Sequence, residues 1–304
     1  SMPDWLVKFW MNSYGEGKTV DILEGLSAGK DQYHETVVRC NLSKNSTENI
    51  ITSLENDKVS VRRDPILPYA LHISNFDRLD CLAAFKNGEI QVQDISSMLV
   101  GEIASPQKND YCIDVCAAPG GKSLHLADKL DGTGTVDSRD VSYEKIYMIE
   151  ENIRRCGFKN IHAQVKDALD LDVESIHKAD IVLADLPCSG LGIIGNKPDI
   201  KYKMSLDKMK QLASLQREIL SVVQQYVKPG KLLIYSTCTI NPEENEENVK
   251  WFLNSFPYEL VSIEKEIGKE LKCETTNSGY IQLIPGLNKT AGFFIAKLRR
   301  KTDE

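Results

Sequence analysis

Two cysteines stand directly after two apolar segments that are expected to form strands. Cys188 lies in ADLPCSG, residues 184–190, and Cys238 lies in YSTCT, residues 235–239. Asp185 precedes Cys188 in the first of these stretches. A thiolate is a strong nucleophile, and a nearby carboxyl group can hold or share a proton. These residue types indicate covalent catalysis assisted by proton transfer, without deciding which cysteine attacks.

A loop of small residues follows an earlier apolar segment, YCIDVCA, and precedes an expected helix. In α/β folds, such a loop binds ligands between the carboxyl end of a strand and the N-terminus of a helix. Its spacing is neither GxGxxG nor GxxxxGKS/T, so dinucleotide and triphosphate sites lose support. The candidate cofactor-binding residues of the loop are Cys116, Ala117, Ala118, Pro119, Gly120, Gly121 and Lys122.

Two acids end the next two expected strands. Asp140 is placed to bind ribose hydroxyls, and Asp167 is placed to contact an adenine amino group. A ribose and an adenine without a phosphate cradle suggest S-adenosylmethionine. Either acid alone could equally cap a helix or lie in a loop, but their joint placement favours a cofactor site. Asp185, at the end of the fourth strand, belongs to the same edge and is counted among the cofactor contacts.

The elements that must position these residues divide the chain in two. From Gly88 onward, apolar strands alternate with helices, which predicts a parallel sheet in a doubly wound, Rossmann-like α/β fold. Residues 279–298 predict an antiparallel hairpin at the edge of that sheet. Residues 4–28 predict two helices broken at Gly15, and the strands and helix that follow resemble a small α/β unit of RNA-recognition-motif type. We expect domains at 3–87 and 88–304.

Charge favours no partner by itself. The 304 residues carry a net charge of −7, which argues mildly against nucleic acid, but binding depends on local fields. Residues 195–217 are rich in lysine and arginine, and Lys58, Arg62 and Arg63 form a second basic cluster. Each cluster could equally be a solvated surface or a track for phosphates.

Cysteine and histidine spacing point to reduced thiols and no metal. The eight cysteines include no CxxC pair, and the five histidines show no metal-binding spacing. No apolar run approaches the roughly 20 residues that span a bilayer. The expectation is a cytoplasmic protein without a metal or a membrane segment.

Four motifs occur in a specific order: DVCAAPGGKS, DLPCSGLG, KPDIKY and STCTINPEENEENV. Together they resemble the Nop/Sun family of RNA cytosine-C5 methyltransferases. The opening PDWLVKFW and the QDISS segment are similar to the bacterial 16S rRNA branch of that family. The resemblance covers residues 3 to about 300. It implies a class I methyltransferase domain at 88–304 behind an RNA-binding subdomain at 3–87, acting on 16S rRNA as a monomer in rRNA processing, with S-adenosylmethionine as cofactor.

The resemblance also implies roles. Cys238 would add to C6 of cytosine, so that C5 can take up a methyl group, and Cys188 would assist release of the product. DNA cytosine-C5 methyltransferases use the cysteine of a PC motif as the nucleophile, so the reverse assignment stays open. Asp185 would stabilise charge near N3 of the base, through a raised pKa or a shared proton. Lys122 would lie near the pocket, in contact with Asp185.

Some features depart from the family pattern. Many members carry two basic residues before PDIK, where this chain has Asn196-Lys197, which leaves one charge for a phosphate. Relatives acting on 16S rRNA carry a further N-terminal helical domain similar to an antitermination factor, and this chain starts after its expected end. We interpret Asn241 to Glu244 as a helix start with acids in its first turn. Ala291-Gly292 replaces the Asp-Gly of many members, and no role is assigned to it.

Three other functions are weighed against this one. A tRNA cytosine-C5 methyltransferase would use the same chemistry on another RNA. A non-catalytic RNA-binding factor in ribosome assembly could share the fold, but the intact set of Cys188, Cys238 and Asp185 counts against it. A nicotinamide-dependent oxidoreductase is disfavoured because GxGxxG is missing.

Overall fold

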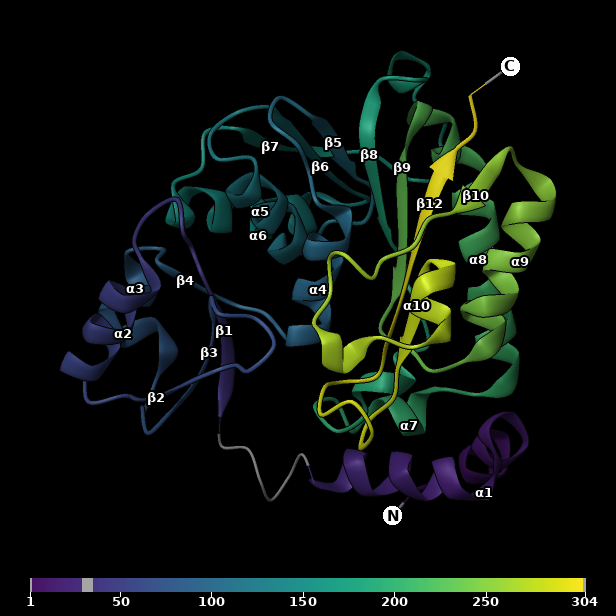
Figure 1. Ribbon diagram of the computed structural model, residues 1–304, viewed down its shortest axis with the longest axis horizontal. Coiled ribbons are helices and arrows are strands. Elements are labelled where there is room, and N and C mark those ends of the chain that lie inside the picture. Colours follow the sequence, from purple (N-terminus) through teal and green to yellow (C-terminus); the bar gives the residue numbers. More distant parts are fainter. Residues whose placement is uncertain (1, 29–34, 303–304) are drawn as a thin grey trace.

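Two β-sheets organise the chain (Figure 1). The computed structural model describes residues 2–28 and 35–302. The smaller sheet has the order β2-β3-β1-β4, and its helices pack on one face through Ile50 and Leu54. Its elements are β1 (Thr36–Cys40), α2 (Thr47–Asn56), β2 (Ser60–Arg63), β3 (Ala70–Ser74), α3 (Ala83–Lys86) and β4 (Ile90–Val92).

The larger sheet has the order β10-β12-β9-β8-β5-β6-β7, with β11 also paired to β12. Strands from β9 to β7 run parallel, and helices cover both faces, which confirms the doubly wound α/β prediction. Its strands are β5 (Tyr111–Asp114), β6 (Thr135–Asp140), β7 (Ile161–Val165), β8 (Ala179–Asp185), β9 (Val227–Thr237), β10 (Tyr258–Leu260), β11 (Tyr280–Leu283) and β12 (Phe293–Arg300). Its helices are α4 (Ile95–Ala104), α5 (Gly121–Lys129), α6 (Tyr143–Cys156), α7 (Ile200–Lys203), α8 (Leu206–Val223), α9 (Glu246–Ser255) and α10 (Glu274–Ser278).

The last hairpin lies at the edge of the sheet, as predicted, and a third strand joins it there. β11 and β12 are antiparallel as expected. However, β12 is not an edge strand, because β9 pairs with one side of it while β10 and β11 pair with different ends of its other side. The long strand β12 therefore pairs with two short edge strands on one side. The sequence around β12 gave no sign of the second one, β10, because β10 lies more than 30 residues before β12 in the chain.

The first helix, α1 (Asp4–Ala28), breaks where the sequence predicts. Gly15 has φ 78° and ψ 171°, a conformation that interrupts the helix and suits glycine. Trp10 is fully buried, and this helix packs against Leu191 and Ile240 of the larger unit rather than against the smaller sheet. Among the described residues, no helix combines the length and apolar character needed to cross a membrane.

Buried polar contacts join the two sheets. Arg39 of β1 forms a 2.6 Å ion pair with Asp128 of α5, and both side chains are buried. Arg155 of α6 donates to the backbone oxygens of Phe85 and Ile90. The smaller sheet extends through β4, past the boundary expected at residue 87, so the division of the chain at that point stays a prediction.

Candidate active site

The two cysteines of the sequence prediction lie side by side. Strands β8 and β9 are parallel neighbours with Asp185 in register with Ser236, so both end at the same edge of the sheet. The segments that follow bring the sulfur atoms of Cys188 and Cys238 to 3.2 Å. Both cysteines are partly exposed, which leaves the pair accessible to a substrate.

The two thiols differ in acidity. The hydrogen bond from Cys188 lowers the pKa of Cys238 and outweighs the opposing effect of burial, and Lys122 and Lys197 lower it further. The same hydrogen bond, followed by burial, raises the pKa of Cys188 well above its ordinary value. The arrangement therefore favours a Cys238 thiolate that accepts a hydrogen bond from the Cys188 thiol.

Asp185 lies at the same edge, held by two side chains. Lys122 Nζ, from the first turn of α5, is 2.7 Å from Asp185 Oδ2. Ser236 Oγ donates to Asp185 Oδ1 at 2.7 Å. Burial lowers the pKa of Lys122, but Asp185 more than offsets this, and the net pKa lies above its ordinary value. Lys122 and Asp185 thus form an ion pair beside the cysteines, and Ser236 is a partner of Asp185 that the sequence did not indicate.

The predicted cofactor loop joins β5 to α5. Gly120 has φ 103° at the start of α5, a left-handed conformation that favours glycine. A methyl group on Gly121 would meet only the Gln93 side chain, at 3.9 Å, so the loop backbone is open to a ligand. Ala118 N donates to Asp140 Oδ2 at 2.9 Å, which fixes the loop against the end of β6. Lys145 Nζ lies 2.8 Å from the other carboxylate oxygen.

Two acids near this loop behave differently. Asp167 accepts a hydrogen bond from the backbone nitrogen of Leu169 at 3.0 Å. Asp114, at the end of β5, is a buried acid that the site prediction missed. Ser123 Oγ donates to its Oδ2 at 2.6 Å, whereas Oδ1 is buried without a partner. Burial raises the pKa of Asp114 to about 7.

The segment after Cys238 does more than begin a helix. Asn241 caps the turn at 242–244 as predicted, and its side chain accepts from Glu243 N. Glu244, however, is completely buried, and its carboxylate accepts hydrogen bonds from Ser189. Glu244 does lie in the first turn, as predicted, but this turn faces the ADLPCSG loop instead of solvent, so the Glu244 carboxylate is buried.

Two glycines allow this loop to approach the last hairpin. Gly292 N donates to Gly192 O at 2.8 Å, and Gly192 N donates to Cys238 O at 3.2 Å. A methyl group on Gly192 would come within 2.0 Å of Gly292 O. Gly292, to which the sequence assigned no role, thus holds the loop that carries Cys188 close to the end of β9.

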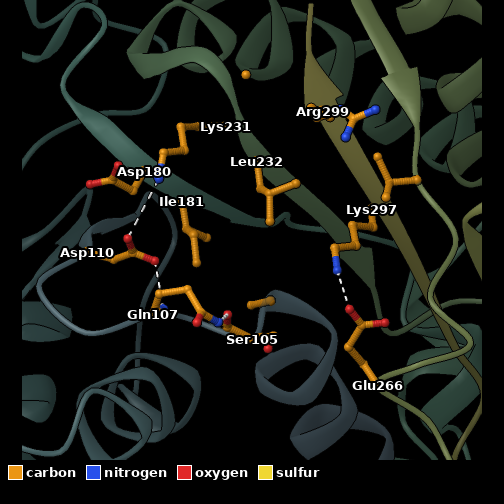
Figure 2. A pocket seen from close by; sticks show the side chains of 13 residues that line it. Ser105, Gln107, Asp110, Asp180, Ile181, Lys231, Leu232, Glu266, Lys297 and Arg299 are labelled. Atoms are coloured by element: carbon orange, nitrogen blue, oxygen red, sulfur yellow. Dashed lines mark hydrogen bonds and ion pairs between the residues drawn. The ribbon is translucent and has the colours of Figure 1, made fainter.

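A cavity of about 320 Å³ lies at the ends of the strands opposite to those that carry the cysteines (Figure 2). It is formed by the other ends of β8 and β9, away from the cysteines. Its charges are already paired, since Lys231 lies 3.1 Å from Asp180 and Lys297 lies 2.6 Å from Glu266. Within residues 2–28 and 35–302, no group of three or more His, Cys, Asp or Glu side chains could hold a metal ion.

Comparison with known proteins points to one family. A profile described as 16S rRNA methyltransferase RsmB/F matches residues 102–299. A profile described as the ferredoxin-like domain of RsmF/B-like methyltransferases matches residues 2–80. The chain is 33% identical to a probable ribosomal RNA small subunit methyltransferase B of Bacillus subtilis (strain 168), over 99% of this chain and 67% of the relative.

Solved structures resemble the chain along its length. The crystal structure of PH0851 has a TM-score of 0.91 at 32% identity, covering 98% of this chain and 66% of that one. The crystal structure of NSun6 from Pyrococcus horikoshii with SFG has a TM-score of 0.87 at 25% identity, covering 99% of each chain.

Proposed function

The chain belongs to the RsmB/F family of 16S rRNA methyltransferases, and we propose that it methylates C5 of a cytosine in 16S rRNA with S-adenosylmethionine. The observation that carries the proposal is the 3.2 Å pair of Cys188 and Cys238 beside Asp185 and Lys122. A nucleophile with a lowered pKa next to a proton donor is what covalent activation of a weakly nucleophilic base carbon requires.

The loop at 116–122 fits S-adenosylmethionine. Its small residues and the open backbone at Gly121 leave room for a ligand at the N-terminus of α5, and the Asp114 carboxylate has one unpartnered oxygen nearby in sequence. We assign the loop and Asp140 to cofactor binding, with Asp140 for the ribose. Asp167 is assigned to the adenine, and Asp185 to both cofactor and base. When bound, the cofactor supplies an electrophilic methyl group.

The protein groups would act in sequence. Cys238, as thiolate, forms a bond to C6 of the cytosine, and the electron pair of the C5–C6 double bond moves toward C5 and N3. Asp185, with Lys122, stabilises the charge that reaches N3. After C5 has gained its methyl group, a base takes the C5 proton, the electron pair of that C–H bond re-forms the C5–C6 double bond, and Cys238 leaves C6 as a thiolate. Cys188 assists this release.

Covalent trapping tests the assignment. RNA carrying a cytosine analogue that stalls elimination is incubated with S-adenosylmethionine and wild-type, Cys188→Ala or Cys238→Ala protein. We expect a denaturation-resistant adduct with wild-type and Cys188→Ala protein and none with Cys238→Ala. An adduct that survives Cys238→Ala and disappears with Cys188→Ala would reverse the two roles.

Substrate choice needs a separate experiment. Bisulfite sequencing of ribosomal and transfer RNA, with and without the gene, should reveal one 5-methylcytosine in 16S rRNA that depends on it. Dependence confined to transfer RNA would contradict the substrate while leaving the mechanism. No binding of S-adenosylmethionine in calorimetry would instead favour a non-catalytic RNA-binding role.

A further inference from the structure

Glu244 is a buried carboxylate surrounded by hydrogen-bond donors. Its side chain is 0% exposed, although it lies within a run of acids. Oε2 accepts from Ser189 N and from Gln216 Nε2, both at 2.9 Å. Oε1 accepts from Ser189 Oγ at 2.5 Å and from Asn241 Nδ2 at 2.9 Å. Four neutral donors thus occupy the roughly four acceptor positions that a carboxylate offers.

The two amide side chains that contact Glu244 present their nitrogen atoms to it, as an acceptor with two oxygen atoms requires. Gln216 Oε1 accepts from Asn248 Nδ2 at 2.9 Å, so its amide nitrogen must point to Glu244. Asn241 Oδ1 accepts from Glu243 N at 3.2 Å, which orients that amide in the same way. As a carboxylate, Glu244 accepts from all of these groups and leaves none of these buried donors without an acceptor, which would be costly.

The same network holds both neighbours of Cys188. Ser189 is bonded to Glu244 through its backbone nitrogen and its hydroxyl group. On the other side, Gln216 Nε2 bridges Glu244 to Pro187 O, at 2.8 Å from that oxygen. The position of the Cys188 sulfur atom, 3.2 Å from Cys238, therefore depends on Glu244.

We infer that Glu244 is a positioning residue that makes the two cysteines chemically unequal, by fixing Cys188 as the hydrogen-bond donor to Cys238. The inference deepens the proposed function and rests on it for its catalytic meaning. Cys188 faces the negative charge of Glu244, which disfavours a second negative charge on that sulfur atom. Cys238 faces Asp185 on one side but also Lys122 and Lys197, whose positive charges favour its thiolate.

The acidity of the two thiols agrees with this geometry. The pKa of Cys188 is raised by its hydrogen bond to Cys238, by burial and by Glu244. The pKa of Cys238 is lowered, first by the hydrogen bond from Cys188. Removal of the Glu244 charge should bring the two values closer together.

Alkylation of the two thiols tests the inference. Wild-type, Glu244→Gln and Glu247→Gln proteins react with iodoacetamide between pH 6 and 9, and mass spectrometry gives the rate at each cysteine. Glu247, an exposed acid in the first turn of α9, provides the matched control. We expect wild-type Cys238 to react faster at neutral pH, and Glu244→Gln to reduce the ratio of Cys238 to Cys188 rates about tenfold, the effect of one pKa unit. Glu247→Gln should leave the ratio unchanged.

Two results would overturn the inference: equal rates of the two cysteines in the wild-type protein, or an unchanged ratio in folded Glu244→Gln protein. If Glu244→Gln does not fold, Ser189→Ala replaces it, because this change removes the hydroxyl link and keeps the charge. Its ratio should fall as Cys188 loses its fixed position, by less than in Glu244→Gln because the charge remains, and a wild-type ratio would contradict the inference.

The alkylation result is separate from the proposed activity. It requires neither RNA nor S-adenosylmethionine, so a protein that fails to methylate RNA could still show unequal thiols. Conversely, a protein that methylates C5 with an unchanged rate ratio in Glu244→Gln would keep the proposed function and lose the role of Glu244.

Discussion

At the scale of single residues, the site is built from pairs in which one member adjusts the chemistry of the other. The sulfur atoms of Cys188 and Cys238 lie 3.2 Å apart in a hydrogen bond, and Lys122 lies 2.7 Å from Asp185. Burial alone would suppress the thiolate of Cys238, as it does for Cys116, whose pKa is raised by desolvation. Cys116 and Cys238 thus differ in acidity, because the pKa of Cys238 is lowered by its hydrogen bond with Cys188 and by two lysines.

Lys122→Met should reduce kcat for methyl transfer by about 10²-fold or more, a usual cost of removing a group that stabilises charge in the transition state. Lys122 also lowers the pKa of Cys238, so its removal raises that pKa. The acid limb of the pH profile of kcat should therefore move to higher pH. Single-turnover rates across pH 5.5–9 measure this shift. Lys265→Met, at an exposed lysine, should match the wild-type profile, and an unshifted limb in Lys122→Met would contradict the electrostatic role.

At the scale of elements, two contacts position the site. The hairpin β11–β12 brings Gly292 against Gly192, and α4 and α5 meet the smaller sheet around His125. His125 is buried, lies 3.6 Å from Glu102, and packs its ring against Tyr69 at 5.5 Å between centroids. Both contacts depend on residues far apart in the sequence, and both are closely packed, so small changes in side-chain size or charge should be measurable.

Gly292→Ala should destabilise the protein by about 1–3 kcal/mol, the usual cost of overpacking. The added methyl group would lie 2.6 Å from Gly192 Cα and 2.8 Å from Ile240 Cγ2. Urea denaturation measures the change. Gly17→Ala is the control, because a methyl group there meets nothing within 4 Å and suits a helix. Equal stability of Gly292→Ala and wild type would contradict the prediction, because the hairpin would then accommodate the added methyl group without strain.

His125 should make stability fall in mild acid. Burial lowers the pKa of His125 from 6.5 to about 4. Between these two pH values, His125 binds a proton in the unfolded chain but not in the folded chain. Stability is complete above pH 6.5 and decreases as the pH falls, by about 2 kcal/mol at pH 5. Urea titrations at pH 5 and 8 should show this loss in the wild type and much less in His125→Gln. His162→Gln, at a half-exposed histidine, should retain the wild-type dependence.

At the scale of the whole molecule, the chain is acidic in total but has one segment that is rich in positive charge. The chain carries a net charge of −7, yet the loop after Cys188 and the start of α8 carry a concentration of lysines. Lys197 is exposed in this region and also acts on the pKa of Cys238, so the basic segment and the cysteines share one side of the molecule. An RNA bound there would place its phosphates on the lysines and a cytosine at the thiols.

Lys197→Ala should weaken RNA binding at low salt and reduce the slope of log Kd against log salt concentration by about 1, the contribution of one phosphate contact. Fluorescence anisotropy with a labelled 16S rRNA fragment, from 50 to 300 mM salt, measures both quantities. Lys265→Ala should behave as wild type. Identical slopes for Lys197→Ala and wild type would place the RNA elsewhere.

Local signals in the sequence determined much of this protein. Strand and helix periodicity predicted the doubly wound sheet, and the positions of Cys188, Cys238 and Asp185 after apolar strands predicted that they meet, because parallel strands end at one edge. The break at Gly15 and the cap at Asn241 were equally legible, since glycine conformation and capping act within a few residues.

Only the tertiary structure decided how these residues differ from one another. The run of acids after Cys238 contains one carboxylate that is buried against the ADLPCSG loop, and composition cannot separate Glu244 from Glu247. Ser236, Asp114 and Gly292 gain their roles from contacts across strands. The acidity of each thiol likewise depends on burial and on charges brought from distant segments, and these quantities exist only after the chain has packed.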